Sequence, residues 1–240
     1  MKRYSHEHGL EDIERNSALG RVGRRLQSLT VLQKVAGLVG AGAVGLAVVM
    51  IARSSSAMRA RPYPGPGRTA VIGDSIVAHP TGFVQYLDRS VPGRSFRNFG
   101  VVGQGTAAIR RDLRNRVIGQ GFDEVVIEGG INDFGRPNTL EYVTGNLRGM
   151  VQEAKAAGLK VVLLTMTPYY RDTAKIAQGN AIILREGRGW GADVVVDTHS
   201  GLKTLGGEIR SEYSAPDRIH LNREGQLVMG RQIQAMAYAQ

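Results

Sequence analysis

The sequence contains no cysteine. This absence excludes disulfide bonds, thiolate metal sites and cysteine nucleophiles, but an oxidising compartment remains permitted. No histidine and carboxylate pair has a spacing typical of metal ligands, so we expect neither a metal nor a cofactor. The sequence also lacks zinc-finger spacing and basic motifs interleaved with aromatics, which argues against a specific nucleic-acid partner.

The charge of the chain is unevenly distributed. Of a formal net charge of +10, residues 1–67 carry the larger share, with ten Lys/Arg against four Asp/Glu, while residues 68–240 hold 21 against 17. With 42% hydrophobic residues in 240, the chain has enough apolar material for one core and an appendage. The basic excess is therefore better explained by a membrane-flanking segment than by a polyanion-binding domain.

One long apolar run, 35-VAGLVGAGAVGLAVVMIA-52, contains no charge and no hydroxyl group. As a helix its 18 residues rise about 27 Å, just enough for a hydrocarbon core of about 30 Å. A cleaved signal peptide is a weaker interpretation because 34 polar or mixed residues come first, and a buried soluble helix remains an alternative. We predict a basic N-terminal segment at 1–34 and a transmembrane anchor helix at 35–52 that contacts the lipid bilayer.

The residues around this run indicate its orientation. Seven Lys/Arg precede it and four follow up to Arg68, which favours a cytoplasmic N-terminus and an extracytoplasmic main domain, in the periplasm or at the cell surface. Gly37, Ala41 and Gly45 form a small-residue face that permits self-association through the helix. Residues 53–67, rich in Ser, Pro and Gly, are predicted to link the anchor to a domain at 68–240.

In this domain, short apolar runs alternate with helix-like segments. The runs are near-continuous in Val, Ile and Leu, a pattern typical of parallel strands covered on both faces. The predicted fold is a three-layer α/β/α arrangement with a mostly parallel five-stranded sheet. The candidate strands are 69–73, 95–100, 124–130, 160–166 and 193–197, and the candidate helices are about 82–90, 105–118, 139–157, 172–188 and 223–238.

Four polar segments follow in order along this pattern. They are 73-GDSI-76, 98-NFGVVGQGT-106, 129-GGINDF-134 and 217-DRIH-220. Together they resemble the four blocks of the GDSL/SGNH hydrolase family, over about residues 68–240. The resemblance implies an SGNH, flavodoxin-like fold and a serine esterase, lipase or acetylesterase activity. The family usually has Leu after the serine and often Gly after the aspartate, so Ile76 and Arg218 depart from its pattern.

The residue types also fit nucleophilic catalysis. A serine hydroxyl needs a base to take its proton, and that base must be held in one tautomer. In Asp217-x-x-His220, one turn lets the carboxylate reach Nδ1 and leaves Nε2 facing Ser75. We predict Ser75, Asp217 and His220 as the catalytic residues. The resemblance implies an oxyanion hole formed by the backbone N–H groups of Ser75 and Gly103 and the side-chain amide of Asn132.

Each of these residues has a structural alternative. Ser75 could cap the helix after its strand, and Asn132 could belong to an ordinary turn. His199 is a rival base, whereas His79 is expected at the pocket mouth or in solvent. The arginine-rich run 110–116 is expected to be a solvated face, with contact to anionic lipid or glycan as the functional alternative.

These observations predict a membrane-anchored carboxylic ester hydrolase. The expected substrate is an acyl ester, with a leaning towards O-acetyl groups on a carbohydrate such as a cell-wall or exported polysaccharide, because the domain leaves little room for a lid over a long acyl chain. The alternatives are a lysophospholipase or thioesterase of the same family and a catalytically silent glycan-binding protein. Specific substrate-binding residues are not predicted.

Overall fold

The computed structural model describes residues 67–238. Five strands alternate with helices along this part of the chain. The strands are β1 (Gly67–Ile72), β2 (Arg94–Asn98), β3 (Glu124–Ile127), β4 (Lys160–Leu164) and β5 (Val194–Val196). The helices are α3 (Phe83–Ser90), α4 (Thr106–Asp112), α5 (Ile131–Phe134), α6 (Leu140–Ala156), α7 (Thr173–Glu186) and α8 (Arg223–Ala237), with a π-helical turn at Leu113–Val117 and a 3₁₀ turn at Ser211–Tyr213.

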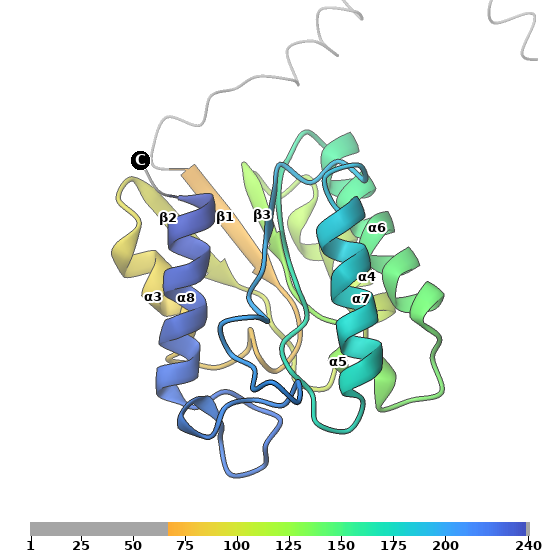
Figure 1. Cartoon of the computed structure of the whole chain (residues 1–240). Helices are drawn as coiled ribbons and strands as arrows, with labels where there is room; N and C mark the ends of the chain where they lie inside the picture. Colours follow the sequence, from red (N-terminus) through yellow and green to blue (C-terminus); the bar gives the residue numbers. More distant parts are fainter. Residues whose placement is uncertain (1–66, 239–240) are drawn as a thin grey trace, which may run out of the picture. The chain divides into compact units, whose positions relative to one another are not determined.

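All five strands are parallel and lie in the order β2-β1-β3-β4-β5. Helices α3 and α8 pack together on one face of the sheet, and α4, α6 and α7 cover the other (Figure 1). Because both faces are covered, β3 is buried along its length and β4 everywhere but at Lys160, as their continuous apolar runs predict. The predicted three-layer fold with a parallel five-stranded sheet is confirmed.

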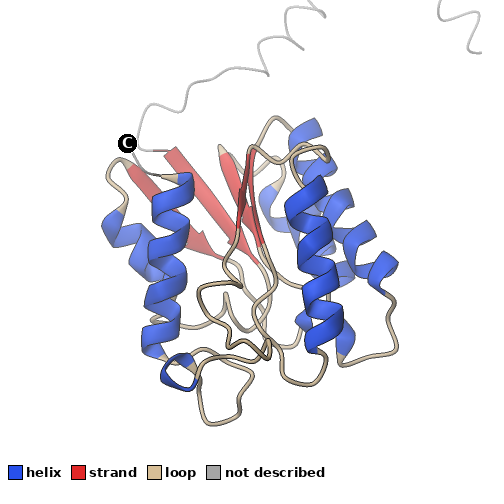
Figure 2. Ribbon diagram, viewed as in Figure 1, coloured by secondary structure: helices blue, strands red, loops and turns tan. Residues whose placement is uncertain are grey.

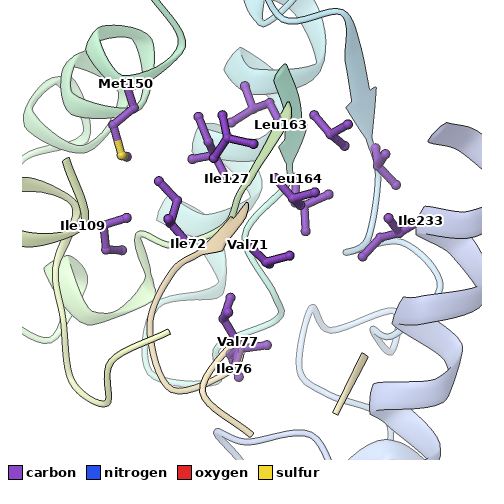
Figure 3. Packing of buried hydrophobic residues seen from close by; sticks show 14 of the residues in the cluster. Val71, Ile72, Ile76, Val77, Ile109, Ile127, Met150, Leu163, Leu164 and Ile233 are labelled. Carbon is purple, nitrogen blue, oxygen red and sulfur yellow. The ribbon is translucent and has the colours of Figure 1, made fainter. Parts of the chain in front are cut away.

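The core lies on both sides of β1, β3 and β4. Ile72, Ile127 and Leu163 are fully buried in the middle layer, with Met150 of α6 on one side and Ile233 of α8 on the other (Figure 3). Complete burial of such side chains stabilises a fold by about 1.5–3 kcal/mol each. This packing makes the sheet a rigid support for the loops at its carboxyl edge, which gather at one end of the domain (Figure 2).

The side on which new strands join the sheet changes between β2 and β3. From β1 the chain passes to the edge strand β2 and then returns to place β3 on the other side of β1. In open parallel sheets, ligands bind beyond the carboxyl ends of the strands at such a switch point. The segments after β1 and β3 carry Ser75 and Asn132, so two predicted site residues flank this point.

Some predicted boundaries differ from the structure. The strands predicted at 124–130 and 160–166 end at Ile127 and Leu164. The helix predicted at 105–118 divides into α4 and the π-helical turn, in which the Ile118 N–H donates to Leu113 O at 3.0 Å. The short helix α5 was not predicted, because its four residues follow two glycines and provide no helical periodicity.

Residues 35–52, the predicted anchor, lie outside the described residues. Within 67–238, no helix combines the length and apolarity needed to cross a bilayer. The arginine-rich run at 110–116 is largely paired within the domain. Arg110 and Arg114 both bind Glu153, and Arg116 binds Asp112. Three of its four arginines are therefore in ion pairs, but with only two carboxylates, so about half of the arginine charge is compensated locally.

Candidate active site

Ser75 lies in a tight turn directly after β1. The Ile76 N–H donates to Asp74 Oδ1 at 2.9 Å, so Asp74 organises this turn through its side chain, as expected. Gly73 is required sterically, since a Cβ at this position would lie 2.4 Å from Val77 Cγ2. Helix α3 begins only at Phe83 and has Gly82 as its N-cap, so Ser75 does not cap it. The structural alternative for Ser75 is therefore wrong.

His220 and Asp217 come together within one short loop before α8. Asp217 Oδ1 accepts hydrogen bonds from the backbone N–H groups of Ile219 and His220, each at 2.9 Å, and Oδ2 lies 2.5 Å from His220 Nδ1. These bonds, with that to the imidazole first, lower the pKa of Asp217 to about 2. The carboxylate therefore remains ionised at neutral pH and can hold the imidazole in one orientation.

Ser75 and His220 meet although 145 positions separate them. His220 Nε2 lies 2.9 Å from Ser75 Oγ. Gln226 of α8 supports this approach, because it accepts a hydrogen bond from the Phe83 N–H at 2.9 Å and donates to Ile76 O at 3.1 Å. Since Gln226 is buried, it fixes the start of α8 against the turn that carries Ser75.

Two backbone N–H groups near Ser75 are open. In the described part of the chain, the N–H groups of Ser75 and Gly103 donate no hydrogen bond. Gly103 has φ of +75°, a conformation that favours glycine. Its carbonyl accepts a hydrogen bond from Arg136 Nη2 at 3.0 Å, which fixes the loop on the side away from the N–H. Open, fixed N–H donors are what an oxyanion requires.

Asn132 lies at the start of α5, next to these groups. Its amide already donates twice, to Asp74 Oδ2 and to Gln104 O, both at 3.0 Å. The amide therefore bridges the Ser75 turn and the Gly103 loop. It can donate to a bound oxyanion only by sharing or exchanging one of these two bonds.

The two other histidines of the described residues, His79 and His199, are not joined to Ser75. The His199 ring is buried after β5, and no described residue donates to or accepts from its Nδ1. Burial lowers the pKa of His199. His79 Nδ1 accepts a local hydrogen bond from the Thr81 N–H at 3.3 Å. Within residues 67–238, no group of three or more histidine or acidic side chains is arranged to hold a metal ion.

The sequence profile of the GDSL-like lipase/acylhydrolase family matches residues 71–228. The chain belongs to this family. It is a carboxylic ester hydrolase. No curated protein matches the chain at a significant level.

Solved structures show the same fold. A protein assigned as an acylhydrolase from Bacteroides fragilis is 25% identical, with a TM-score of 0.62 over 76% of this chain and 91% of its own. A GDSL-like lipase from Bacteroides thetaiotaomicron is 23% identical, with a TM-score of 0.62 over 76% and 93%. A catalytic mutant of an acetylxylan esterase from Geobacillus stearothermophilus is 23% identical, with a TM-score of 0.63 over 73% and 96%.

The structure explains one departure from the GDSL pattern. Arg218 follows Asp217 where the family often has glycine, and its φ of +61° is one that few residues other than glycine adopt. Two contacts hold it there. Its guanidinium pairs with Glu208 at 3.0 Å and lies 4.9 Å from the ring centroid of Tyr170. Side-chain contacts thus stabilise a backbone conformation that glycine adopts without strain.

Sequence reasoning missed three residues around this site. Gln226 and Arg136 have no distinctive local pattern, because their partners are distant in the sequence. Glu128 did give a signal, since it is the only carboxylate between Val125 and Asn132, at the end of an apolar strand. A charged residue in such a position is rarely buried without a reason.

Proposed function

We propose that this hydrolase is a membrane-anchored serine esterase that removes O-acetyl groups from a carbohydrate outside the cytoplasmic membrane. The observation that carries the proposal is the hydrogen-bonded series from Asp217 through His220 to Ser75, with distances of 2.5 and 2.9 Å. A nucleophile, a base in reach of it and a carboxylate that orients the base are the parts that acyl transfer needs.

The first step forms an acyl-enzyme. Ser75 Oγ attacks the acyl carbonyl while His220 Nε2 takes the hydroxyl proton, and Asp217 stabilises the resulting imidazolium. The negative oxygen of the tetrahedral intermediate accepts hydrogen bonds from the N–H groups of Ser75 and Gly103. As the intermediate collapses, His220 returns the proton to the leaving oxygen, and the alcohol departs with the C–O bond broken.

The second step releases the acid. Water loses a proton to His220 and attacks the acyl-enzyme, and the same donors stabilise the second tetrahedral intermediate. Its collapse returns the proton to Ser75 Oγ and frees the carboxylic acid. Asn132 contributes when its bond to Gln104 O or to Asp74 is exchanged for one to the oxyanion. A single such donor is typically worth about 2.7–4 kcal/mol in the transition state.

The exposure of the site favours an ester with a large alcohol group. The Asp217 and His220 side chains are 48% and 40% exposed, so the scissile bond would lie near the surface, where a polymer can approach. Among similar structures, the acetylxylan esterase has catalytic mutants at an aspartate and a histidine three residues apart, the spacing of Asp217 and His220. This similarity supports an acetylated glycan as substrate.

The proposed location rests on the sequence. The charge-free run at 35–52 and the larger number of basic residues before it support an anchor with a cytoplasmic N-terminus. The small-residue face of the run supports self-association within the bilayer as a further proposal. A domain so placed would meet cell-wall or exported polysaccharides.

Kinetics on esters of different chain length test the substrate class. We expect kcat/KM for 4-nitrophenyl acetate to exceed that for the decanoate at least about tenfold, and acetate release from an acetylated xylan, with Ser75→Ala as the inactive control. Much faster turnover of the decanoate would favour the lysophospholipase or thioesterase alternative. Glycan binding without acetate release from any ester would favour the silent binding protein.

A further inference from the structure

Two carboxyl groups are buried side by side beneath the Ser75 turn. Asp74 follows β1 and Glu128 follows β3, the neighbouring strand, and both side chains are fully buried. The Glu128 N–H donates to Ile72 O at 3.1 Å, which continues the sheet between them. A Cβ on Gly73 would lie 2.8 Å from Glu128 Oε2, so the Glu128 carboxyl lies directly against the backbone that leads to Ser75.

The two groups differ in their hydrogen bonds. Asp74 accepts one at each oxygen, from the Ile76 N–H at 2.9 Å and from Asn132 Nδ2 at 3.0 Å. In the described part of the chain, neither oxygen of Glu128 has a hydrogen-bond partner other than Asp74. A buried carboxylate without a donor is unstable relative to the neutral acid, whereas one that accepts two N–H bonds is stabilised as the anion.

The surroundings of the pair decide where its proton resides. Burial raises the pKa of Asp74 to about 6, and the other charged groups that act on it are His220 and Asp133. Burial and then the charge of Asp74 raise the pKa of Glu128 well above its ordinary value. Within residues 67–238, no lysine or arginine forms an ion pair with either carboxyl group. Because two N–H groups donate to Asp74 and none from outside the pair donates to Glu128, the charge is favoured on Asp74 and the proton on Glu128.

We propose that Glu128 is a positioning residue for ester hydrolysis. As a neutral acid it leaves Asp74 as the only charged group of the pair. The Asp74 carboxylate then holds both the Ser75 turn and the Asn132 amide. When Glu128 loses its proton in alkaline solution, two carboxylates face each other in a buried site. Their repulsion displaces Asp74 from Ile76 and Asn132 and so loosens the nucleophile and the amide together. The inference rests on the proposed function.

The test compares pH profiles of the full-length wild type and Glu128→Gln. Glutamine keeps the shape and neutrality of the protonated acid but cannot ionise. We expect similar kcat near pH 7, an alkaline fall in kcat for the wild type, and a variant-to-wild-type ratio that rises roughly tenfold by about pH 9.5. Glu124→Gln is the matched control, because Glu124 is a buried glutamate at the other end of β3, held by Thr69, Arg94 and Tyr238. Its profile should follow the wild type.

Thermal unfolding provides a second readout. A carboxyl whose pKa is raised on folding contributes stability at low pH that is lost as the pH rises. The Tm of Glu128→Gln should therefore rise relative to that of the wild type between about pH 5 and 9. Carboxyl-carbon NMR of wild-type protein labelled with ¹³C-glutamate needs no variant, and should show one glutamate that titrates well above the others.

The outcomes separate the two proposals. Superimposable pH profiles, or glutamates that all titrate in the ordinary range, would overturn the role of Glu128. Labelling of wild-type Ser75 by a fluorophosphonate at pH 7 is measured in parallel. If Ser75 is labelled and the profiles coincide, the inference fails alone, and if Ser75 is not labelled, the proposed function fails with it.

Discussion

Asp217 uses both carboxylate oxygens, one for its own loop and one for the catalytic imidazole. Oδ1 closes the turn through two backbone N–H groups, and Oδ2 binds Nδ1 of His220. The same carboxylate that shapes the loop therefore sets the tautomer of the base. The group needs no burial for this purpose, because three hydrogen bonds already favour its ionised form.

Replacing this carboxylate should impair chemistry without unfolding the domain. In Asp217→Asn the amide can no longer hold the Nδ1–H and stabilise the imidazolium, so we expect kcat to fall by roughly 10²–10⁴. Asp172→Asn is the control, since Asp172 caps α7 at the surface through its bond with the Lys175 N–H. An Asp217→Asn enzyme within threefold of wild-type kcat would contradict the assigned role.

At the scale of elements, α8 and the Ser75 turn depend on Gln226. Gln226→Leu leaves the Phe83 N–H and the Ile76 carbonyl buried without partners, which should cost about 2–4 kcal/mol of unfolding free energy and lower kcat. Gln234 also joins α8 to α3, through Tyr86 and the Ser90 carbonyl. Gln234→Leu should therefore lower stability with little change in kcat. Equal kcat losses in both variants would argue against a specific role for Gln226.

The loop after β2 depends on Arg136 in a similar way. Arg136→Met removes the donor to Gly103 O, and we expect kcat to fall about three- to tenfold with a smaller change in KM, because a loosened oxyanion donor acts mainly in the transition state. Arg111→Met is the control, since Arg111 and Arg136 line one pocket of about 240 Å³, and only Arg136 of the two donates a hydrogen bond to Gly103 O. A change in KM alone would indicate that Arg136 binds substrate instead.

Local patterns predicted the elements well and the contacts between them poorly. Continuous Val and Ile runs are sufficient for buried parallel strands, and Asp217-x-x-His220 is a contact within one turn. The meeting of Ser75 and His220 was expected from the chemistry of a serine nucleophile and from the family resemblance, since no periodicity relates the two residues. Gln226 and Arg136 were missed because their partners become neighbours only when the sheet brings the loops together.

At the scale of the whole molecule, the proposal separates anchoring from chemistry. Substituting Val44→Glu together with Leu46→Glu places two carboxylates in the apolar run, where acidic residues are strongly disfavoured. We expect the full-length variant to leave the membrane fraction and retain its kcat. Ser54→Glu with Ser55→Glu, in the predicted linker, should remain in membranes. If the apolar-run variant still fractionated with membranes, residues 35–52 would not be the anchor.

The central claim is that Ser75 is a nucleophile activated by His220. The most direct test is fluorophosphonate labelling of the full-length protein, with the modified residue located by peptide mass spectrometry. The account predicts one adduct, on Ser75, that is lost in His220→Gln and retained in His199→Gln, because His220 Nε2 lies 2.9 Å from Ser75 Oγ. A folded wild-type protein without an adduct, or labelling that depends on His199 instead, would contradict it.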